Sequence, residues 1–263
     1  IESSVCHNDN SGVCNSNAVE FDNVSLTYKN AAEESLSGIS FAAEKGQVIG
    51  VIGGTGSGKT SLVSLIPHFY DATCGTVYVN GIDVKAQDDD LLKSKIGFVL
   101  QKAALFKGTV RDNLKWGSES ASDEEMLAAL SQAQILDSVN EKGGLNAEIE
   151  QNGANLSGGQ KQRAAVARAV ITQPQLLLAD EPTGSLDSAR SVEIMELLTE
   201  LNREDGITIA LVTHEPDMAK FARRHLLFRD GELISDTVGG LPRSEMPFCL
   251  PSARSRAIRC AVF

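Results

Sequence analysis

Short runs of apolar residues recur along most of the chain and are separated by polar, glycine-containing segments. Residues 48–52, 96–100, 176–179 and 207–212 are rich in Val, Ile and Leu. Runs without regular polar alternation are typical of strands that are buried on both faces, as in a parallel sheet. Because segments with helical spacing separate several of these runs, we expect strands and helices to alternate in an α/β core.

A hairpin signal lies in the N-terminal third of the chain. Residues 76–79 read TVYV and lead into Asn80-Gly81, a dipeptide that favours a two-residue hairpin turn. Ile82 continues the strand pattern after the turn. The N-terminal part is therefore expected to form an antiparallel β region.

The pattern becomes helical between about residues 102 and 171. Ser122 and Glu125 fit the S-x-x-E box that caps a helix N-terminus, and Met126 and Leu130 follow at helical spacing. We expect this stretch to be a helical subdomain inserted into the core.

The two ends of the chain lack periodicity. Residues 1–18 are rich in Ser, Asn and Asp and predict a flexible linker, residues 19–237 the ordered domain, and residues 238–263 an irregular tail. The chain begins with Ile1 and shows no charged-then-apolar leader. We therefore expect a domain excised from a longer chain, or a trimmed form of one.

Composition narrows the possible partners. The 263 residues carry a formal net charge of −11, and no block of Lys and Arg stands out, which argues against a nucleic-acid surface. No apolar run approaches the roughly 18 residues needed to cross a bilayer. The odd number of cysteines, without a leader, predicts reduced thiols, and their spacing does not favour zinc. The cysteines are Cys6, Cys14, Cys74, Cys249 and Cys260.

A phosphate-binding motif follows the first buried run. Gly53 to Thr60 reads GGTGSGKT and fits G-x-x-x-x-G-K-[ST]. Glycines let successive N–H groups converge on phosphate oxygens, and we expect a helix over residues 60–69 whose N-terminus favours anions. Lys59 would neutralise phosphate charge, and Thr60 offers a hydroxyl for Mg²⁺. A simple turn would leave these residue types unexplained. The expected nucleotide-binding residues are Gly53, Gly54, Thr55, Gly56, Ser57, Gly58, Lys59, Thr60 and Ser61.

Two adjacent carboxylates end the run at 176–179. Asp180 is a candidate Mg²⁺ ligand, and Glu181 is the candidate base that polarises an attacking water. Taken alone, such a pair before Pro182 fits a helix N-cap equally well. The phosphate loop upstream favours the catalytic interpretation.

A second glycine-containing motif, LSGGQ, spans Leu156, Ser157, Gly158, Gly159 and Gln160. Its serine and glutamine fit a capping box, which an ordinary helix start would also explain, but the glycine pair in a first helical turn is costly. With these motifs in this order, residues 19–236 resemble the nucleotide-binding domain of the ABC transporter family. The resemblance implies a P-loop NTPase (RecA-like) core with an N-terminal antiparallel β region and an inserted α-helical subdomain.

The resemblance also implies site residues. In that family LSGGQ contacts the γ-phosphate of ATP bound to the opposite subunit, so two ATPs with Mg²⁺ are clamped between two head-to-tail domains. By the same resemblance, Tyr28 stacks on adenine, Gln101 senses Mg²⁺ and couples to the membrane domain, and His214 contacts the γ-phosphate. From the residues alone, Tyr28 could equally pack in the core, Gln101 could be a solvated residue at a strand end, and His214 could cap a helix. Ser185, Leu186 and Asp187 resemble the loop that crosses to the partner domain, although Gly184 precedes them.

The family implies an ATPase whose partners are a second ABC ATPase domain, identical or different, and a transmembrane domain or subunit, with no nucleic acid. It would lie at the cytoplasmic face of a membrane. Residues 101–116 look like exporters whose membrane and ATPase parts share one chain. ADEPTGSLDS and VTHEPDMA look more like the ATPase subunits of lipoprotein-release and macrolide-efflux systems. Export is therefore favoured, and the substrate stays open.

Two other functions share these nucleotide motifs. A soluble ABC-type ATPase of DNA repair or translation usually looks like two linked ATPase domains, or carries a long coiled-coil or zinc insertion between the phosphate loop and LSGGQ. This chain has no heptad run or paired cysteines there, and its net charge is acidic. A nucleotide-sensing regulatory domain would require a damaged site, whereas every catalytic position is occupied.

Overall fold

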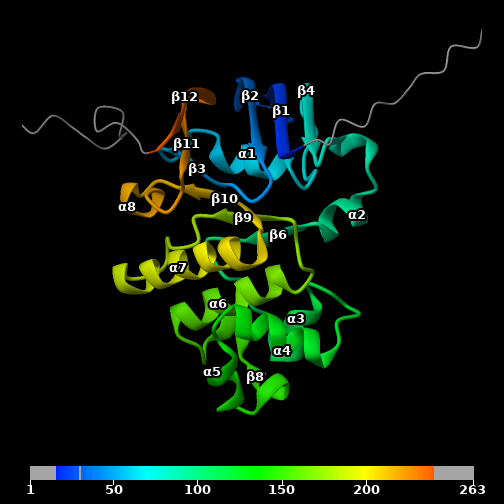
Figure 1. The fold of residues 1–263 in the computed structure, drawn as a ribbon, viewed down its shortest axis with the longest axis vertical. Helices are drawn as coiled ribbons and strands as arrows, with labels where there is room; N and C mark the ends of the chain where they lie inside the picture. The colour runs from blue at the N-terminus through cyan, green and yellow to red at the C-terminus, as the bar shows by residue number, and fades with distance from the viewer. Residues whose placement is uncertain (1–15, 30, 240–263) are drawn as a thin grey trace, which may run out of the picture.

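The computed structural model describes residues 16–29 and 31–239. The linker predicted before residue 16, the tail from residue 240 and all cysteines except Cys74 lie outside the described residues. Cys74 is exposed and carries a free thiol. Within the described part, an antiparallel sheet, a central mostly parallel sheet and a group of helices follow one another along the long axis (Figure 1).

The antiparallel sheet has the strand order β2-β1-β4-β5. It consists of β1 (Asn17–Leu26), β2 (Leu36–Glu44), β4 (Cys74–Val79) and β5 (Ile82–Asp83). The predicted hairpin is confirmed: Val79 pairs with Ile82, and Asn80 and Gly81 have φ angles of 52° and 78°. β1 begins at Asn17, two residues before the expected start of the domain.

The central sheet has the order β12-β11-β3-β10-β9-β6, and its strands are parallel except for β12. It comprises β3 (Val48–Gly53), β6 (Ile96–Val99), β9 (Leu176–Asp180), β10 (Thr208–Thr213), β11 (Arg224–Arg229) and β12 (Glu232–Val238). Every residue of β9 and β10 is buried, as the unbroken apolar runs predict. The edge strand β12 is exposed at alternate positions.

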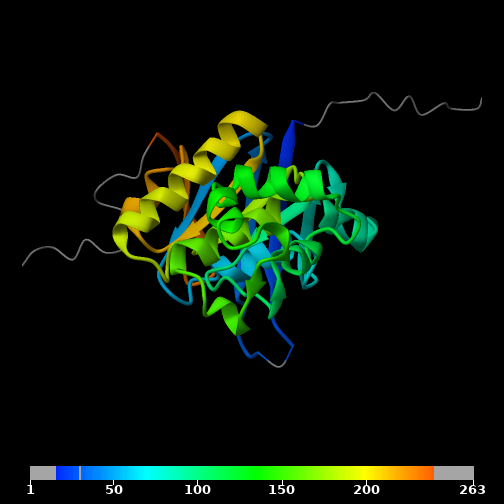
Figure 2. The same ribbon diagram turned by 90° about the horizontal axis from the view of Figure 1, so that it is seen from below.

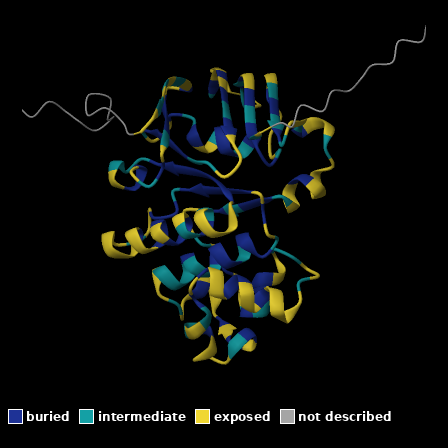
Figure 3. Ribbon diagram, in the orientation of Figure 1, coloured by how far each residue is buried: buried dark blue, intermediate teal, exposed yellow. Residues whose placement is uncertain are grey.

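Two apolar cores lie on opposite faces of this sheet. Side chains of successive strand residues point to opposite faces, so Leu176 and Leu178 pack with the antiparallel sheet and helix α1 (Lys59–Leu65). Leu177 and Ala179 pack with α6 (Gly158–Val170) and α7 (Ser188–Asp205). The central strands are accordingly buried throughout, whereas α7 shows an exposed outer face (Figure 3).

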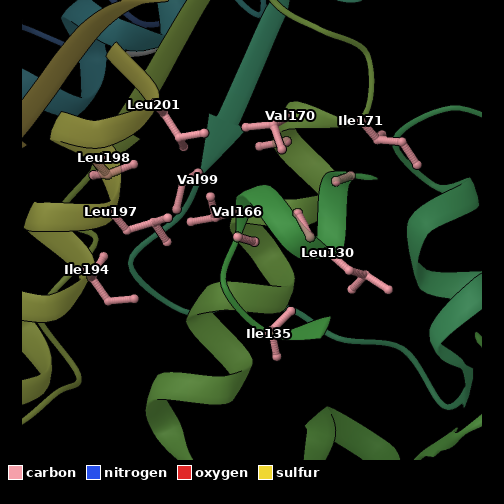
Figure 4. Packing of buried hydrophobic residues seen from close by; sticks show 14 of the residues in the cluster. Val99, Leu130, Ile135, Val166, Val170, Ile171, Ile194, Leu197, Leu198 and Leu201 are labelled. Atoms are coloured by element: carbon pink, nitrogen blue, oxygen red, sulfur yellow. The ribbon is translucent and has the colours of Figure 1, made fainter. Parts of the chain in front are cut away.

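The helices between β6 and β9 cover the second face of the sheet, as the view from below shows (Figure 2). Val99 of β6, Val166 and Val170 of α6, and Leu197 and Leu201 of α7 point into one core (Figure 4). The remaining elements are α2 (Asp89–Ser94), α3 (Val110–Lys115), α4 (Asp123–Gln132), α5 (Leu136–Asn140), α8 (Pro216–Ala219), the 3-10 turns η1 (Val84–Ala86), η2 (Gly144–Asn146) and η3 (Gln151–Gly153), and the short pair β7 (Gly108–Thr109) and β8 (Glu148–Ile149).

The predicted capping box at Ser122 is confirmed, whereas the predicted C-terminal end of the helix after the phosphate loop is wrong. Ser122 and Glu125 form the predicted capping box of α4. The helix expected over residues 60–69 ends at Leu65. Pro67 has no N–H to continue the hydrogen-bond ladder, and His68 adopts a left-handed conformation with φ 57°. The chain therefore leaves the helix early and turns toward β4.

Candidate active site

The phosphate loop, Gln101, Glu181 and His214 lie where four neighbouring strands end. β3, β10, β9 and β6 are adjacent and parallel, so their carboxyl ends meet at one edge of the sheet. The phosphate loop follows β3, Glu181 follows β9, His214 follows β10, and Gln101 lies two residues beyond β6. A cavity of about 600 Å³ opens at this edge. It is lined by Glu33, Glu34, Ser35, Thr55, Gly56, Ser57, Gly58, Lys59, Thr60, Ser61, Gln101, Asp180, Glu181, Asp230 and Gly231.

The phosphate loop requires glycine for different reasons at different positions. Gly56 and Gly58 have φ angles of 81° and 95°, a region that side chains disfavour. At Gly53 the limit is space, because a Cβ would lie 2.4 Å from the Phe228 carbonyl oxygen. At Gly54 a Cβ would meet no heavy atom within 4 Å. The loop therefore packs closely against β11 at Gly53, whereas it leaves space for a larger side chain at Gly54.

Lys59 lies buried at the start of α1. Its Nζ donates to the carbonyl oxygens of Gly53 at 2.9 Å and Gly54 at 2.7 Å. Burial lowers the pKa of Lys59, and the negative charges of Glu181 and Asp180 oppose that shift. The ammonium group thus lies within the phosphate loop, where its positive charge suits an anionic ligand.

Asp180, at the end of β9, is buried, and its Oδ1 has no hydrogen-bond partner among the described residues. Burial raises the pKa of this carboxyl, while a hydrogen bond from Thr60 and the charge of Lys59 act in the opposite direction. A carboxylate oxygen and a hydroxyl are hard ligands of the kind that Mg²⁺ accepts. Among the described residues, no group of three His, Cys, Asp or Glu side chains surrounds one point.

Glu181 and His214 form a pair at the mouth of the site. Oε1 of Glu181 lies 2.8 Å from Nδ1 of His214, and because a carboxylate only accepts, Nδ1 is assigned as the donor. Glu181 has φ 48°, unusual for a residue with a side chain, and its N–H donates to the Val212 carbonyl. This backbone bond holds Glu181 beside β10, the strand that leads to His214.

Gln101 lines the cavity beside Gly184. A Cβ at position 184 would lie 2.7 Å from Nε2 of Gln101, so the glycine that departs from the family pattern makes room for this amide. Tyr28 lies beside α1, where its hydroxyl bonds to Ser61 at 3.0 Å and its ring meets Tyr70 edge-on. It packs against the core and is not among the cavity residues, so adenine stacking stays a prediction.

The LSGGQ residues do not line the cavity. Ser157 caps α6, and Gln160 completes the predicted capping box. A Cβ at Gly158 would lie 3.1 Å from Leu186, so this motif packs on the loop Ser185, Leu186 and Asp187 of the same chain. Asp187 in turn caps α7. Within one chain these predicted residues therefore form a second surface, separate from the phosphate loop.

Sequence reasoning missed the other side of the cavity. Glu33, Glu34, Ser35 and Asp230 line it because two turns fold over the phosphate loop. The N–H of Gly231 donates to the carbonyl of Ser57, and the N–H of Ser37 donates to the carbonyl of Gly231. No local sequence signal marks these long-range contacts.

Together the fold and the site define a P-loop nucleotide-binding domain. The family described as "ABC transporter" matches residues 36–184. The chain is 37% identical over 220 residues to "Uncharacterized ABC transporter ATP-binding protein YfiB" of Bacillus subtilis, covering 83% of this chain and 38% of that protein. It is 38% identical over 217 residues to "Macrolide export ATP-binding/permease protein MacB" of Marinobacter nauticus, covering 81% and 33%.

A solved structure agrees with these relatives. The structure of a bacterial Atm1-family ABC exporter with ATP bound superposes with a TM-score of 0.76 at 31% identity, covering 86% of this chain and 39% of that chain. The chain therefore belongs to the ABC transporter family, as an ATP-binding domain of the exporter type. It spans between a third and two fifths of the length of the relatives described above.

Proposed function

We propose that this chain binds ATP with Mg²⁺, closes head-to-tail with a second ATPase domain, and hydrolyses ATP to drive export through a membrane partner. The observation that carries the proposal is that one cavity is lined by Lys59, by Asp180, whose buried Oδ1 has no partner among the described residues, and by Glu181, which bonds to His214. Each supplies one requirement of phosphoryl transfer to water: metal binding, charge compensation and an oriented base.

The chain's own residues divide the chemistry. The N–H groups at the start of α1 and the Lys59 ammonium bind the phosphate groups, and Thr60 and Asp180 hold the metal ion. When bound, Mg²⁺ neutralises charge on the phosphate oxygens. Glu181 orients a water and accepts its proton, while His214 holds one carboxylate oxygen and leaves the other free.

The second ATPase domain completes the site. Ser157 and Gly158 are exposed at the N-terminus of α6 and lie outside the cavity of their own chain. A helix start with a glycine pair suits an anion brought by another molecule. The proposed arrangement has each chain offering LSGGQ to the phosphate held by the other, which excludes water when the pair closes.

A membrane partner would dock beside the helical region. A cavity of about 440 Å³ there is lined by Phe98, Trp116 and Arg168, among others. Trp116 is 69% exposed and its ring lies 4.9 Å from that of Phe106, which is 46% exposed. Arg168 donates to the Ala104 carbonyl and has no carboxylate partner among the described residues. An apolar partner segment with an acidic residue fits this surface.

The described residues contain no helix with the length and apolar character needed to cross a bilayer. The exporter relatives support an outward transport direction and a position at the cytoplasmic face of a membrane for this chain.

The test compares Glu181→Gln with Glu141→Gln, an exposed control at the end of α5 that does not line the cavity. Glu181→Gln is expected to lower ATP turnover by a factor of about 10² to 10⁴ with ATP affinity retained, and the control to match the wild type. Lys59→Ala is expected to weaken ATP binding itself, measured by titration with labelled ATP. Near wild-type turnover in Glu181→Gln would remove it from the base role. Turnover stimulated by DNA or ribosomes rather than by a membrane partner would favour the repair or translation alternative.

A further inference from the structure

A buried histidine outside the nucleotide cavity has one satisfied and one unsatisfied ring nitrogen. His225, on β11, is 3% exposed. Its Nε2 lies 2.9 Å from the carbonyl oxygen of Ala219, the last residue of α8. Because a carbonyl only accepts, Nε2 is assigned the proton, and Nδ1 is a buried acceptor that no group in the described part of the chain contacts by a hydrogen bond. An apolar residue would fill this place without that unpaired nitrogen.

The strand that carries the phosphate loop makes room for this ring. His225 pairs with Gly50 of β3 in the parallel register. A Cβ at Gly50 would lie 3.4 Å from Cδ2 of His225 and 3.1 Å from Cβ of Ala222. Glycine at position 50 therefore lets the imidazole lie against β3 while it reaches across to α8.

A continuous set of hydrogen bonds joins His225 to the residues that flank His214. The N–H of Ala219 donates to the carbonyl of Glu215 at 3.1 Å. The N–H of Glu215 donates to Oγ1 of Thr213 at 3.0 Å. His214 lies between these two residues and bonds to Glu181 at 2.8 Å. The N–H of His225 thus bonds to the last residue of a short helix that begins two residues after His214.

We propose that His225 is a positioning residue for ATP hydrolysis, which holds α8 against β11 and thereby keeps His214 aligned with Glu181. The inference rests on the proposed function and adds to it a residue that touches neither nucleotide nor metal. What the histidine supplies, and a leucine would not, is the N–H to Ala219. Misplacement of a catalytic group by about 1 Å can cost a factor of about 10² in rate, so loss of one such bond is expected to matter.

The experiment compares His225→Leu, which removes the donor, with His225→Gln, whose amide keeps one. Ile39→Val in the antiparallel sheet is a control for a small loss of packing. For His225→Leu we expect kcat to fall about tenfold with the KM for ATP changed less than about twofold. We expect His225→Gln to recover most of kcat, and Ile39→Val to match the wild type.

Hydrogen exchange supplies a readout that does not depend on turnover. In His225→Leu, the amides of Glu215 and of residues 217–222 should exchange about tenfold faster while those of β3 stay unchanged, and His225→Gln should restore protection. Equal kcat values in wild type and His225→Leu, or equal losses in the Leu and Gln variants, would overturn the positioning role. A wild-type chain without ATPase activity would refute the proposed function instead, and the exchange pattern would still decide whether His225 fixes α8.

Discussion

Asp180 gives the sharpest test of the metal site, because its charge costs stability until a cation arrives. The carboxylate is buried beside the like charge of Glu181, and its Oδ1 has no partner among the described residues. Asp180→Asn keeps the shape of the side chain and removes the charge. A buried unsatisfied polar group costs about 1–3 kcal/mol and a charged one more. Asn remains a polar group at this position, so the variant relieves only the additional cost of the charge, and the loss of the attraction to Lys59 offsets part of that gain. We expect the free energy of unfolding of the nucleotide-free protein to rise by about 1 kcal/mol.

The pH dependence has a definite sign. Burial raises the folded-state pKa of Asp180 above its ordinary value of 3.8, so the folded state binds the proton more tightly than the unfolded state. Stability is therefore lost as the pH rises from 3.8 through the folded-state pKa. The advantage of Asp180→Asn over the wild type should be complete above the raised folded-state pKa and should vanish below pH 3.8.

The assay is thermal unfolding at pH 7 with EDTA alone, with ATP and EDTA, and with ATP and Mg²⁺. Without nucleotide, Asp180→Asn should unfold about 2–4 °C above the wild type. Ligand at 100 times its Kd stabilises a folded protein by about 2.7 kcal/mol, and the part of this effect that depends on Mg²⁺ should be lost in the variant. Asp22→Asn, an exposed change on β1, is the matched control. An unchanged Mg²⁺ effect, or a nucleotide-free variant less stable than the wild type by more than about 1 kcal/mol, would refute the reasoning.

Two further predictions concern the phosphate loop and the end of α1. Gly53→Ala should lower the free energy of unfolding by about 2 kcal/mol or more, because its Cβ would meet the Phe228 carbonyl. Gly54→Ala should change the free energy of unfolding by less than about 0.5 kcal/mol. Equal losses of stability for the two variants in urea unfolding would contradict this prediction. Hydrogen bonding to Asp71 raises the pKa of His68 above 6.5, and Asp89 contributes to this shift. The protonated imidazole therefore stabilises the folded state fully below pH 6.5, and this stabilisation is lost as the pH rises through the raised pKa. NMR titration of the His68 imidazole should show the raised pKa, and a measured pKa at or below 6.5 would contradict this prediction.

Local signals in the sequence predicted much of the fold. The Asn80-Gly81 turn and the capping boxes at Ser122 and Ser157 depend on residues within a few positions of one another, and the structure contains all three. The unbroken apolar runs, which are also local features of the sequence, predicted the buried parallel strands. The end of α1 was mispredicted, although Pro67 was present in the sequence as a signal.

Long-range contacts were not predictable in this way. Asp230 reaches the cavity through a turn that folds over Ser57, and the fit of Gly184 to Gln101 joins residues from two different strand ends. The bond from His225 to Ala219 likewise depends on how β11 packs against α8. The motifs identified the chemistry, and the packing of distant segments determined which side chains share the cavity.

The phosphate loop and the LSGGQ motif lie on separate surfaces of one chain, and the central claim is that a second chain brings them together around ATP. Light scattering on the Glu181→Gln variant tests this directly, with ATP and EDTA compared with ATP and Mg²⁺. The account predicts that the molar mass doubles only with ATP and Mg²⁺, and that Ser157→Arg prevents the doubling. A variant that binds ATP and Mg²⁺ yet keeps the mass of one chain at every protein concentration would contradict it.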